Sequence, residues 1–228
     1  MRAWDALPEF MRTEETRYYY DILCKKKFSL AMKRLFDIAA SAIMLVILSP
    51  VFLVLAVFIK IDSPGPVFYR QERVTAYGRR FRIHKFRTMV NHADKKGSLV
   101  TVSNDSRVTR VGRFIRRCRL DEIGQLLDVL RGDMSFVGTR PEVPKYVAAY
   151  TPEMMATLIL PAGITSLTSI QYKDESKLLD AAEDPDAVYI EQILPEKMKI
   201  NLKSLKDFSF WGDMRIMFMT VWSVLGMK

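Results

Sequence analysis

The chain has 228 residues, of which 35 are lysine or arginine and 26 are aspartate or glutamate, so its formal charge is +9. A sequence that is 49% hydrophobic and 27% charged is not that of a disordered polar chain, and the widely separated Cys24 and Cys118 argue against a disulfide scaffold or a zinc ribbon. The positive surplus favours an anionic partner. Charge alone does not distinguish between nucleic acid, an acidic membrane surface and a phosphorylated small molecule.

The chain changes from polar to strongly apolar after its first segment. Residues 1–32 are polar and aromatic, and their apolar residues show no periodic pattern long enough for a domain. We predict that they form an N-terminal extension along a membrane surface. The following run, Ile38–Ile59, contains no charged residue. As one helix it would extend about 33 Å at roughly 1.5 Å per residue, close to a bilayer core of about 30 Å. It begins too far from Met1 for a cleaved signal peptide, so we predict a membrane helix.

Two features disturb a simple spanning helix. Ser49-Pro50 lies near the middle of the run, where proline removes a backbone donor and crowds the carbonyl of Val46, so a kink or break is expected. Basic residues also lie on both sides of the run: Lys25, Lys26, Lys27, Lys33 and Arg34 before it, and Lys60, Arg70, Arg73, Arg79, Arg80 and Arg82 after it. A helix that breaks and returns keeps both clusters on the cytoplasmic side, which positive residues prefer. These residues alone leave a re-entrant helix and a kinked spanning helix equally open.

A β-hairpin is predicted after the apolar run. Residues 67–74 and 79–86 are two short β-forming segments around the turn Ala76-Tyr77-Gly78. Basic residues interleave with aromatic ones in both segments, which fits either a face that meets an anion or a solvated basic face.

A cluster of six arginines, from Arg107 to Arg119, precedes a predicted amphipathic helix over residues 121–131. Gly132 is placed as the C-terminal stop of that helix, and Asp121 lies at its start. Asp121 and Glu122 can be read as an ordinary helix cap. They can also be carboxylates at an anion-binding helix end, where the arginines hold a phosphorylated ligand.

The C-terminal segment is aromatic, and residues 151–200 show no motif that chemistry assigns. Phe208, Phe210, Trp211, Phe218 and Trp222 fit an interfacial helix and a core helix equally well.

Taken in order, these pieces resemble the monotopic phosphoglycosyl transferases, the bacterial sugar transferases that start glycan assembly on polyprenyl phosphate. The resemblance covers about Lys33 to Leu225. It depends on Lys33-Arg34-x-x-Asp37, Ser49-Pro50, Gly65-Pro66-Val67-Phe68, Gln71-Glu72-Arg73, Lys85-Phe86-Arg87-Thr88-Met89, Leu120-Asp121-Glu122, Gly132-Asp133-Met134-Ser135 and Arg140-Pro141-Glu142. Each motif is weak alone, but the ordered set behind a membrane segment is specific.

The resemblance implies an α/β fold, mostly helical with a small β-hairpin or sheet, in a monotopic membrane protein. Residues 1–32 are then the extension, residues 33–60 a re-entrant helix that breaks at Ser49 and Pro50, and residues 61–228 a catalytic domain with interfacial helices. The implied location is the cytoplasmic face of the bacterial inner membrane.

The implied reaction transfers a sugar-1-phosphate from a UDP-sugar to polyprenyl phosphate with release of UMP, as the first membrane step of glycan assembly. By position, Asp121 would be the nucleophile that carries the phosphosugar covalently, with Glu122 as its catalytic partner. The basic positions that would contact phosphate are Lys85, Arg87, Arg116 and Arg140. The implied cofactor is Mg²⁺, with Asp121 as its ligand, since this ion is typically held by one or two carboxylates and substrate phosphates.

The chain departs from the family pattern at several positions. Gly124 and Thr139 stand where the family commonly has proline, and Thr75 and Ser166 stand where it has glycine. Because none of these removes a reacting group, the predicted activity is unchanged.

A second hypothesis is a non-catalytic basic protein at the membrane surface that binds anionic lipid or a partner in glycan assembly. Nucleic-acid binding is disfavoured, because the chain has a long apolar run and no recognisable helix-turn-helix or zinc module. The identity of the sugar and the formation of homo-oligomers stay open.

Overall fold

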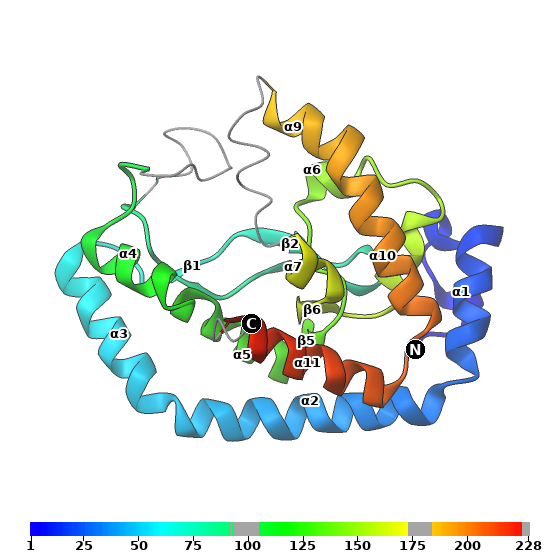
Figure 1. Cartoon of the computed structure of the whole chain (residues 1–228), viewed down its shortest axis with the longest axis horizontal. Helices are drawn as coiled ribbons and strands as arrows, with labels where there is room; N and C mark the ends of the chain where they lie inside the picture. Colours follow the sequence, from blue (N-terminus) through cyan, green and yellow to red (C-terminus); the bar gives the residue numbers. More distant parts are fainter. Residues whose placement is uncertain (92, 94–104, 173–183, 225–228) are drawn as a thin grey trace.

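The computed structural model describes residues 1–91, 93, 105–172 and 184–224. Its described part is mostly helical, with three small two-stranded sheets, as the sequence predicts. Helices α2 (Lys27–Ile47) and α3 (Ser49–Asp62) form one edge of the molecule, and the remaining elements lie on their inner side (Figure 1).

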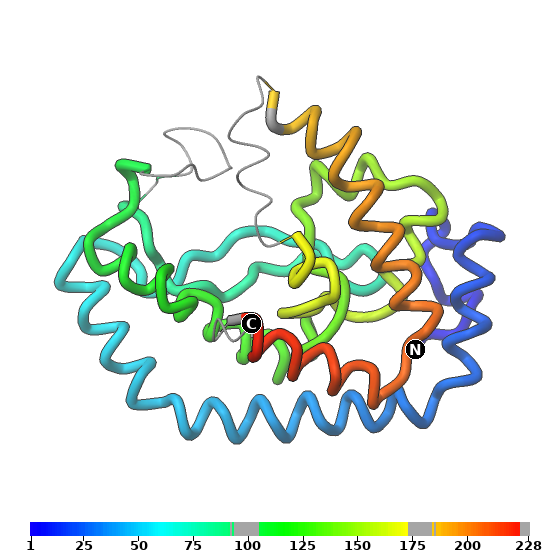
Figure 2. Tube along the Cα trace, viewed as in Figure 1, coloured from blue at the N-terminus to red at the C-terminus, as the bar shows by residue number. Residues whose placement is uncertain are grey.

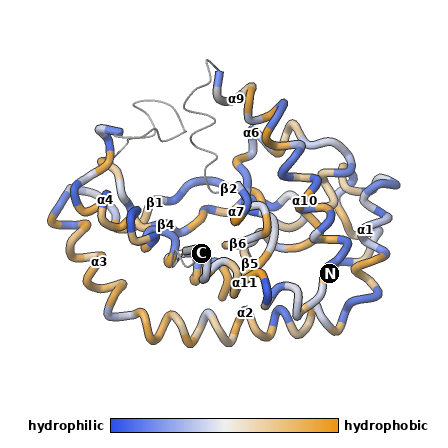
Figure 3. The backbone as a smooth tube through the Cα atoms, viewed as in Figure 1, coloured by the Kyte–Doolittle hydropathy of each residue, from blue (hydrophilic) through white to orange (hydrophobic). Residues whose placement is uncertain are grey.

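The predicted break in the apolar run is present. Helices α2 and α3 meet at Leu48 and are bent by 60°. Pro50 lies in the first turn of α3, where its missing donor is tolerated, and the Ser49 hydroxyl donates to the carbonyl of Val46 at 2.8 Å. Among the described residues no single helix is long and apolar enough to cross a membrane. The bent pair of α2 and α3 together has the length and the apolar composition that a membrane segment needs. Figure 3 shows the hydrophobic colour along both helices.

The predicted hairpin is also present. Strand β2 (Glu72–Val74) pairs antiparallel with β3 (Arg80–Arg82), and β1 (Phe68–Tyr69) pairs with β4 (Lys85–Phe86). The register stays the same through both ladders. The turn is the short helix η3 (Ala76–Gly78), where Tyr77 has a φ of 61°. Lys85 therefore has a fixed place at the end of the hairpin.

The predicted helix over residues 121–131 begins differently. Helix α4 (Arg110–Arg117) is followed by a 3-10 helix, η5 (Leu120–Gln125), and only then by α5 (Leu126–Arg131). The predicted stop is confirmed, since Gly132 follows α5 with a φ of 86°, the left-handed conformation that glycine adopts easily. Asp121 and Glu122 thus lie on a 3-10 turn.

A parallel pair of strands, β5 (Met134–Val137) and β6 (Ala162–Thr165), links this region to the C-terminal helix. Helix α11 (Phe210–Val224) lies against α2 and both strands. Lys33 of α2 donates to the carbonyl of Val137 at 2.7 Å and pairs with Asp213 of α11. Helix α11 buries Asp213 on its packed side and exposes Trp211, Phe218 and Trp222. Contact of these exposed aromatic residues with a membrane interface stays a prediction.

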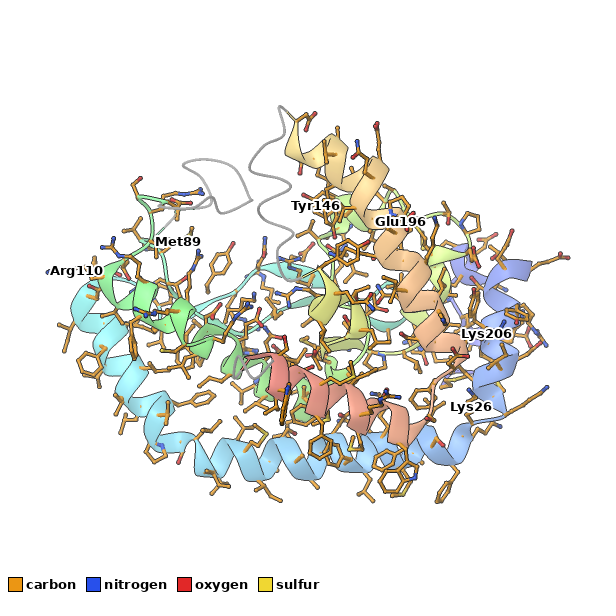
Figure 4. All side chains as sticks on the ribbon, in the orientation of Figure 1. Lys26, Met89, Arg110, Tyr146, Glu196 and Lys206 are labelled. Atoms are coloured by element: carbon orange, nitrogen blue, oxygen red, sulfur yellow. The ribbon has the colours of Figure 1, made fainter. Side chains whose placement is uncertain are left out.

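The N-terminal segment packs on the rest of the fold. Its helices are η1 (Trp4–Ala6), η2 (Glu9–Met11) and α1 (Glu14–Cys24). Helix α1 lies against η6 (Met154–Ile159) and α10 (Leu194–Lys206) (Figure 2). Met11 and Leu23 are fully buried in the apolar cluster between them. Lys26, labelled in Figure 4, donates to the carbonyls of Lys206 and Phe208. Residues 1–26 therefore pack against α10 and contact its C-terminal end.

The remaining helices are short. Of these, α6, α9 and η7 lie toward the end of α10 that is distant from α2, whereas α7 lies against α10 and α11 (Figure 1). They are α6 (Pro144–Val147), α7 (Leu167–Gln171), α9 (Pro185–Val188) and the π-helical turn η7 (Tyr189–Ile193), which continues into α10.

Candidate active site

Asp121 and Glu122 are carried on a 3-10 turn that packs closely on the hairpin. The residue before the turn, Arg119, has a left-handed backbone with a φ of 57°, and no side chain caps this end. Asp121 lies in the first turn of η5, so it does not serve as the helix cap that its type and position also allowed. A Cβ at Gly124 would lie 2.8 Å from the carbonyl oxygen of His84. Glycine at 124 thus lets the turn approach the backbone beside Lys85.

Glu122 is held between two cations. Its Oε1 accepts hydrogen bonds from Lys85 Nζ at 2.9 Å and from Arg140 Nη2 at 2.8 Å. Burial raises the pKa of Glu122, but the charges and hydrogen bonds of Arg140 and Lys85 outweigh it and hold the pKa well below its usual range. Glu122 is therefore ionised at neutral pH.

Asp121 has the opposite electrostatic environment. Burial raises its pKa, the charge of Glu122 raises it further, and Lys85 and Arg116 offset only part of this. Two adjacent carboxylates thus differ in their surroundings, one paired and ionised, the other with a raised pKa. Such a separation is typical of sites where two acidic groups take different roles.

The four predicted phosphate-binding residues do not share one place. Lys85 and Arg140 contact Glu122, as described above, and the charge of Arg116 acts on Asp121 while its Nε donates to Thr88 Oγ1 at 2.8 Å. Arg87 is buried and donates to the backbone carbonyls of Ile59, Ser63 and Pro64. These contacts tie Arg87 to the end of α3, and its role toward phosphate remains a prediction.

The arginine cluster also divides. On α4, Arg113 and Arg117 are exposed, whereas Arg116 is half-buried against Thr88. Arg107 pairs with Asp105 through its guanidinium group, with a shortest contact of 2.6 Å. Only part of the cluster therefore faces the carboxylates.

A cavity of about 920 Å³ adjoins this site. Glu122 and Arg140 line it, as do Arg117 and Arg119. Its apolar lining includes Met44 of α2, Leu126 of α5, Phe136 of β5, and Met217 and Val221 of α11. Since a side chain of the apolar helix pair lines the same space as Glu122, the cavity connects the charged site to α2.

Sequence reasoning missed a second group of ionisable residues in this cavity. Tyr189 donates to Glu142 Oε1, and Lys197 Nζ lies 3.0 Å from the Tyr189 hydroxyl and 3.8 Å from Glu142 Oε1. Glu142 belongs to the motif Arg140-Pro141-Glu142, but that motif assigns it no role. Tyr189 and Lys197 lie in a region without a motif, and only the fold brings them to Glu142.

The described residues offer a limited set of metal ligands. No group of three or more His, Cys, Asp or Glu side chains in that part of the chain is placed to hold a metal ion. Within the described site Lys85 and Arg140 pair with Glu122. The role of Asp121 as a ligand of Mg²⁺ stays a prediction.

Residues 28–227 match the sequence model of a family described as bacterial sugar transferase. The chain is 37% identical over 197 residues to an Aeromonas hydrophila protein named UDP-N-acetylgalactosamine-undecaprenyl-phosphate N-acetylgalactosaminephosphotransferase, covering 85% of this chain and 44% of that protein. It is 35% identical over 196 residues to the UDP-glucose:undecaprenyl-phosphate glucose-1-phosphate transferase of Caulobacter vibrioides, with 85% and 69% covered. For the Escherichia coli (strain K12) protein of the same name the identity is 32% over 194 residues, with 83% and 39% covered. The chain thus spans less than half the length of two of these relatives.

Proposed function

The chain belongs to the bacterial sugar transferase family, and on that premise we propose that it transfers a sugar-1-phosphate from a UDP-sugar to undecaprenyl phosphate with release of UMP. The observation that carries this proposal is the contrast between Glu122, paired with Lys85 and Arg140, and the adjacent Asp121, whose pKa is raised by burial. A nucleophilic carboxylate beside fixed cations is what attack on a diphosphate requires.

The reaction proceeds in two displacements at phosphorus. A carboxylate oxygen of Asp121 forms a bond to the β-phosphorus of the donor, and the bond from that phosphorus to the bridging oxygen breaks, so that UMP leaves. The phosphate oxygen of the acceptor then attacks the same phosphorus, and the bond to Asp121 breaks to restore the carboxylate. Because Asp121 carries the phosphosugar between the two steps, the water-soluble donor and the lipid acceptor react at different times.

The cations near Asp121 make the first step feasible. A carboxylate and a phosphate of unit charge about 4 Å apart repel by roughly 4 kcal/mol at an effective dielectric constant of about 20. Lys85 and Arg140 are held in place by Glu122, and their positive charges lie ready for the phosphates of the donor. Glu122 thus acts by orienting cations rather than by exchanging a proton.

Mg²⁺ fits the same arrangement. A carboxylate oxygen of Asp121 together with the diphosphate would hold the ion, which adds further positive charge next to the phosphates when bound.

The acceptor reaches the site along the apolar side of the cavity. Met44, Leu126 and Met217 line it and belong to α2, α5 and α11. Helices α2 and α3 expose many large apolar side chains, among them Ile43, Val46, Ile47, Leu53 and Phe58. We place this bent pair in the cytoplasmic leaflet of the inner membrane, entering and returning on one face, which keeps both basic clusters in the cytoplasm.

Release of UMP tests the proposal. The purified chain in detergent or lipid particles receives undecaprenyl phosphate and, in turn, several UDP-sugars with Mg²⁺. The wild type is expected to release UMP from at least one donor, and Asp121→Asn to release none above background. Asp21→Asn, which changes an exposed aspartate paired with Arg17, serves as the matched control and should be fully active. A wild type that releases no UMP would support the non-catalytic lipid-binding or partner-binding hypothesis instead. UMP release by Asp121→Asn at the wild-type rate would exclude Asp121 as the nucleophile.

A further inference from the structure

Glu142, Tyr189 and Lys197 form a buried polar wall in the cavity that Glu122 also lines. Their residues are only 7%, 4% and 7% exposed. The three come from separate places in the fold: the segment after β5, the π-helical turn η7 and helix α10. Removing a carboxylate and an ammonium group from water is costly, so a pair that faces a cavity instead of filling a core suggests a ligand.

Arg73 adds a second sign of an incomplete site. It lines the same cavity, donates to the carbonyl of Pro141 and to Gln71, and its buried Nε has no hydrogen-bond partner among the described residues. Buried donors in native proteins nearly always have a partner, so this N–H is available to donate a hydrogen bond to a ligand oxygen.

We propose that this polar wall binds the hydroxyl groups of the donor's pyranose ring and thereby selects the sugar that is transferred, an inference that rests on the proposed function. Arg140 and Glu142 are two residues apart, so their Cα atoms are separated by at most about 7 Å. A sugar ring attached to a phosphate at Arg140 therefore lies within reach of Glu142.

The chemistry of the wall suits a sugar better than the other parts of the donor. A hydroxyl group both donates and accepts, so neighbouring hydroxyls can donate to the Glu142 carboxylate and accept from Lys197. A phosphate offers only acceptors, which the carboxylate repels. The edge of uracil offers a single N–H between two carbonyl oxygens, so it supplies fewer donors to the carboxylate than a set of neighbouring hydroxyl groups. Tyr146, whose ring lies 4.5 Å from that of Tyr189, lines the cavity too and offers an apolar surface to the C–H groups of a pyranose.

The test compares two donors that differ at one hydroxyl group. The pair is the one that contains the best donor of the wild type. It is either UDP-glucose with UDP-galactose or UDP-N-acetylglucosamine with UDP-N-acetylgalactosamine. For each, kcat/KM for UMP release is measured in Glu142→Gln and Tyr189→Phe, together with the inhibition constant of UMP. Lys199→Gln is the matched control, since Lys199 lies on α10 near Lys197 but is exposed and paired only with Glu196 among the described residues.

We expect the ratio of kcat/KM for the two epimers to change at least about tenfold in Glu142→Gln and in Tyr189→Phe, while the UMP inhibition constant stays within twofold. The control should keep the wild-type ratio. An unchanged ratio in folded variants would overturn the proposal and make the wall structural. A parallel rise of the UMP inhibition constant would overturn it in favour of nucleoside binding. Both outcomes differ from failure of the proposed function, in which the wild type itself releases no UMP.

Discussion

Lys85 and Glu122 form an ion pair of 2.9 Å that joins the end of the hairpin to the 3-10 turn carrying Asp121. Both side chains are only 21% exposed, so water screens the pair weakly. Because Glu122 also accepts from Arg140, two basic residues from distant parts of the chain are fixed beside one carboxylate pair. The arrangement assigns the two acids different tasks: Glu122 holds the cations, and Asp121 is left for the substrate.

Removing the charge of Lys85 should reduce catalysis strongly. Lys85→Met keeps an apolar stem of similar length but withdraws one of the two cations fixed by Glu122, so we expect kcat/KM for UMP release to fall by about 100-fold or more. The measurement is steady-state UMP release with the best donor. Lys203→Met, on the exposed surface of α10, is the control and should match the wild type. A Lys85→Met enzyme within threefold of the wild type would contradict the assigned role.

The pH dependence should follow the raised pKa of Asp121. The protonated acid is not a nucleophile, so kcat/KM falls on acidification, and the midpoint of that fall lies above the ordinary aspartate value of about 3.9. In Glu122→Gln the neighbouring negative charge, which raises this pKa, is gone. The acidic limb should therefore move to lower pH, whatever the remaining rate. A limb that moves to higher pH, or stays in place, would exclude Asp121 as the titrating group.

The buried pair of Asp128 and His84 should contribute strongly to the free energy of unfolding. Asp128 accepts from the backbone N–H of His84 at 2.8 Å and contacts its ring Nδ1 at 2.5 Å, and both residues are almost fully buried. Asp128→Ala leaves these groups without partners, so we expect the free energy of unfolding to fall by about 3 kcal/mol, or roughly 6–12 °C in the midpoint for a domain of this size. Thermal unfolding in detergent measures this. Asp21→Ala, which breaks an exposed pair, should change the midpoint by no more than about 2–4 °C.

The re-entrant helix pair makes a topological prediction. After replacement of Cys24 and Cys118 by serine, single cysteines introduced as Lys25→Cys and Arg70→Cys flank the bent pair. In oriented vesicles an impermeant thiol reagent should label both positions from the same face. Labelling from opposite faces would show that the pair spans the bilayer.

Much of the framework was predictable because local patterns determine it. Proline at 50 requires a helix to begin anew, the alternation around Tyr77-Gly78 produces the hairpin, and Gly132 ends α5 in the conformation that glycine favours. The acidic pair at Asp121 was also located by its motif. In each case the information lies within a few neighbouring residues.

The parts that were missed depend on contacts between distant segments. Nothing near Arg87 in the sequence shows that the carbonyls at the end of α3 take up its guanidinium group. Residues 120–125 form a 3-10 helix that packs closely on His84 at Gly124. The apolar period of this segment is compatible with an α-helix and does not show that contact. Likewise, Glu142 meets Tyr189 only because η7 and α10 fold back over the segment after β5.

Intact-protein mass spectrometry of the wild type, incubated with a UDP-sugar in the absence of undecaprenyl phosphate, tests the two-step reaction most directly. We expect a fraction of the protein to gain the mass of one phosphosugar, with the added mass mapping to the peptide that contains Asp121 and disappearing when the lipid acceptor is supplied. Steady transfer to the lipid without any adduct under rapid quenching, or an adduct on another residue, would contradict the account.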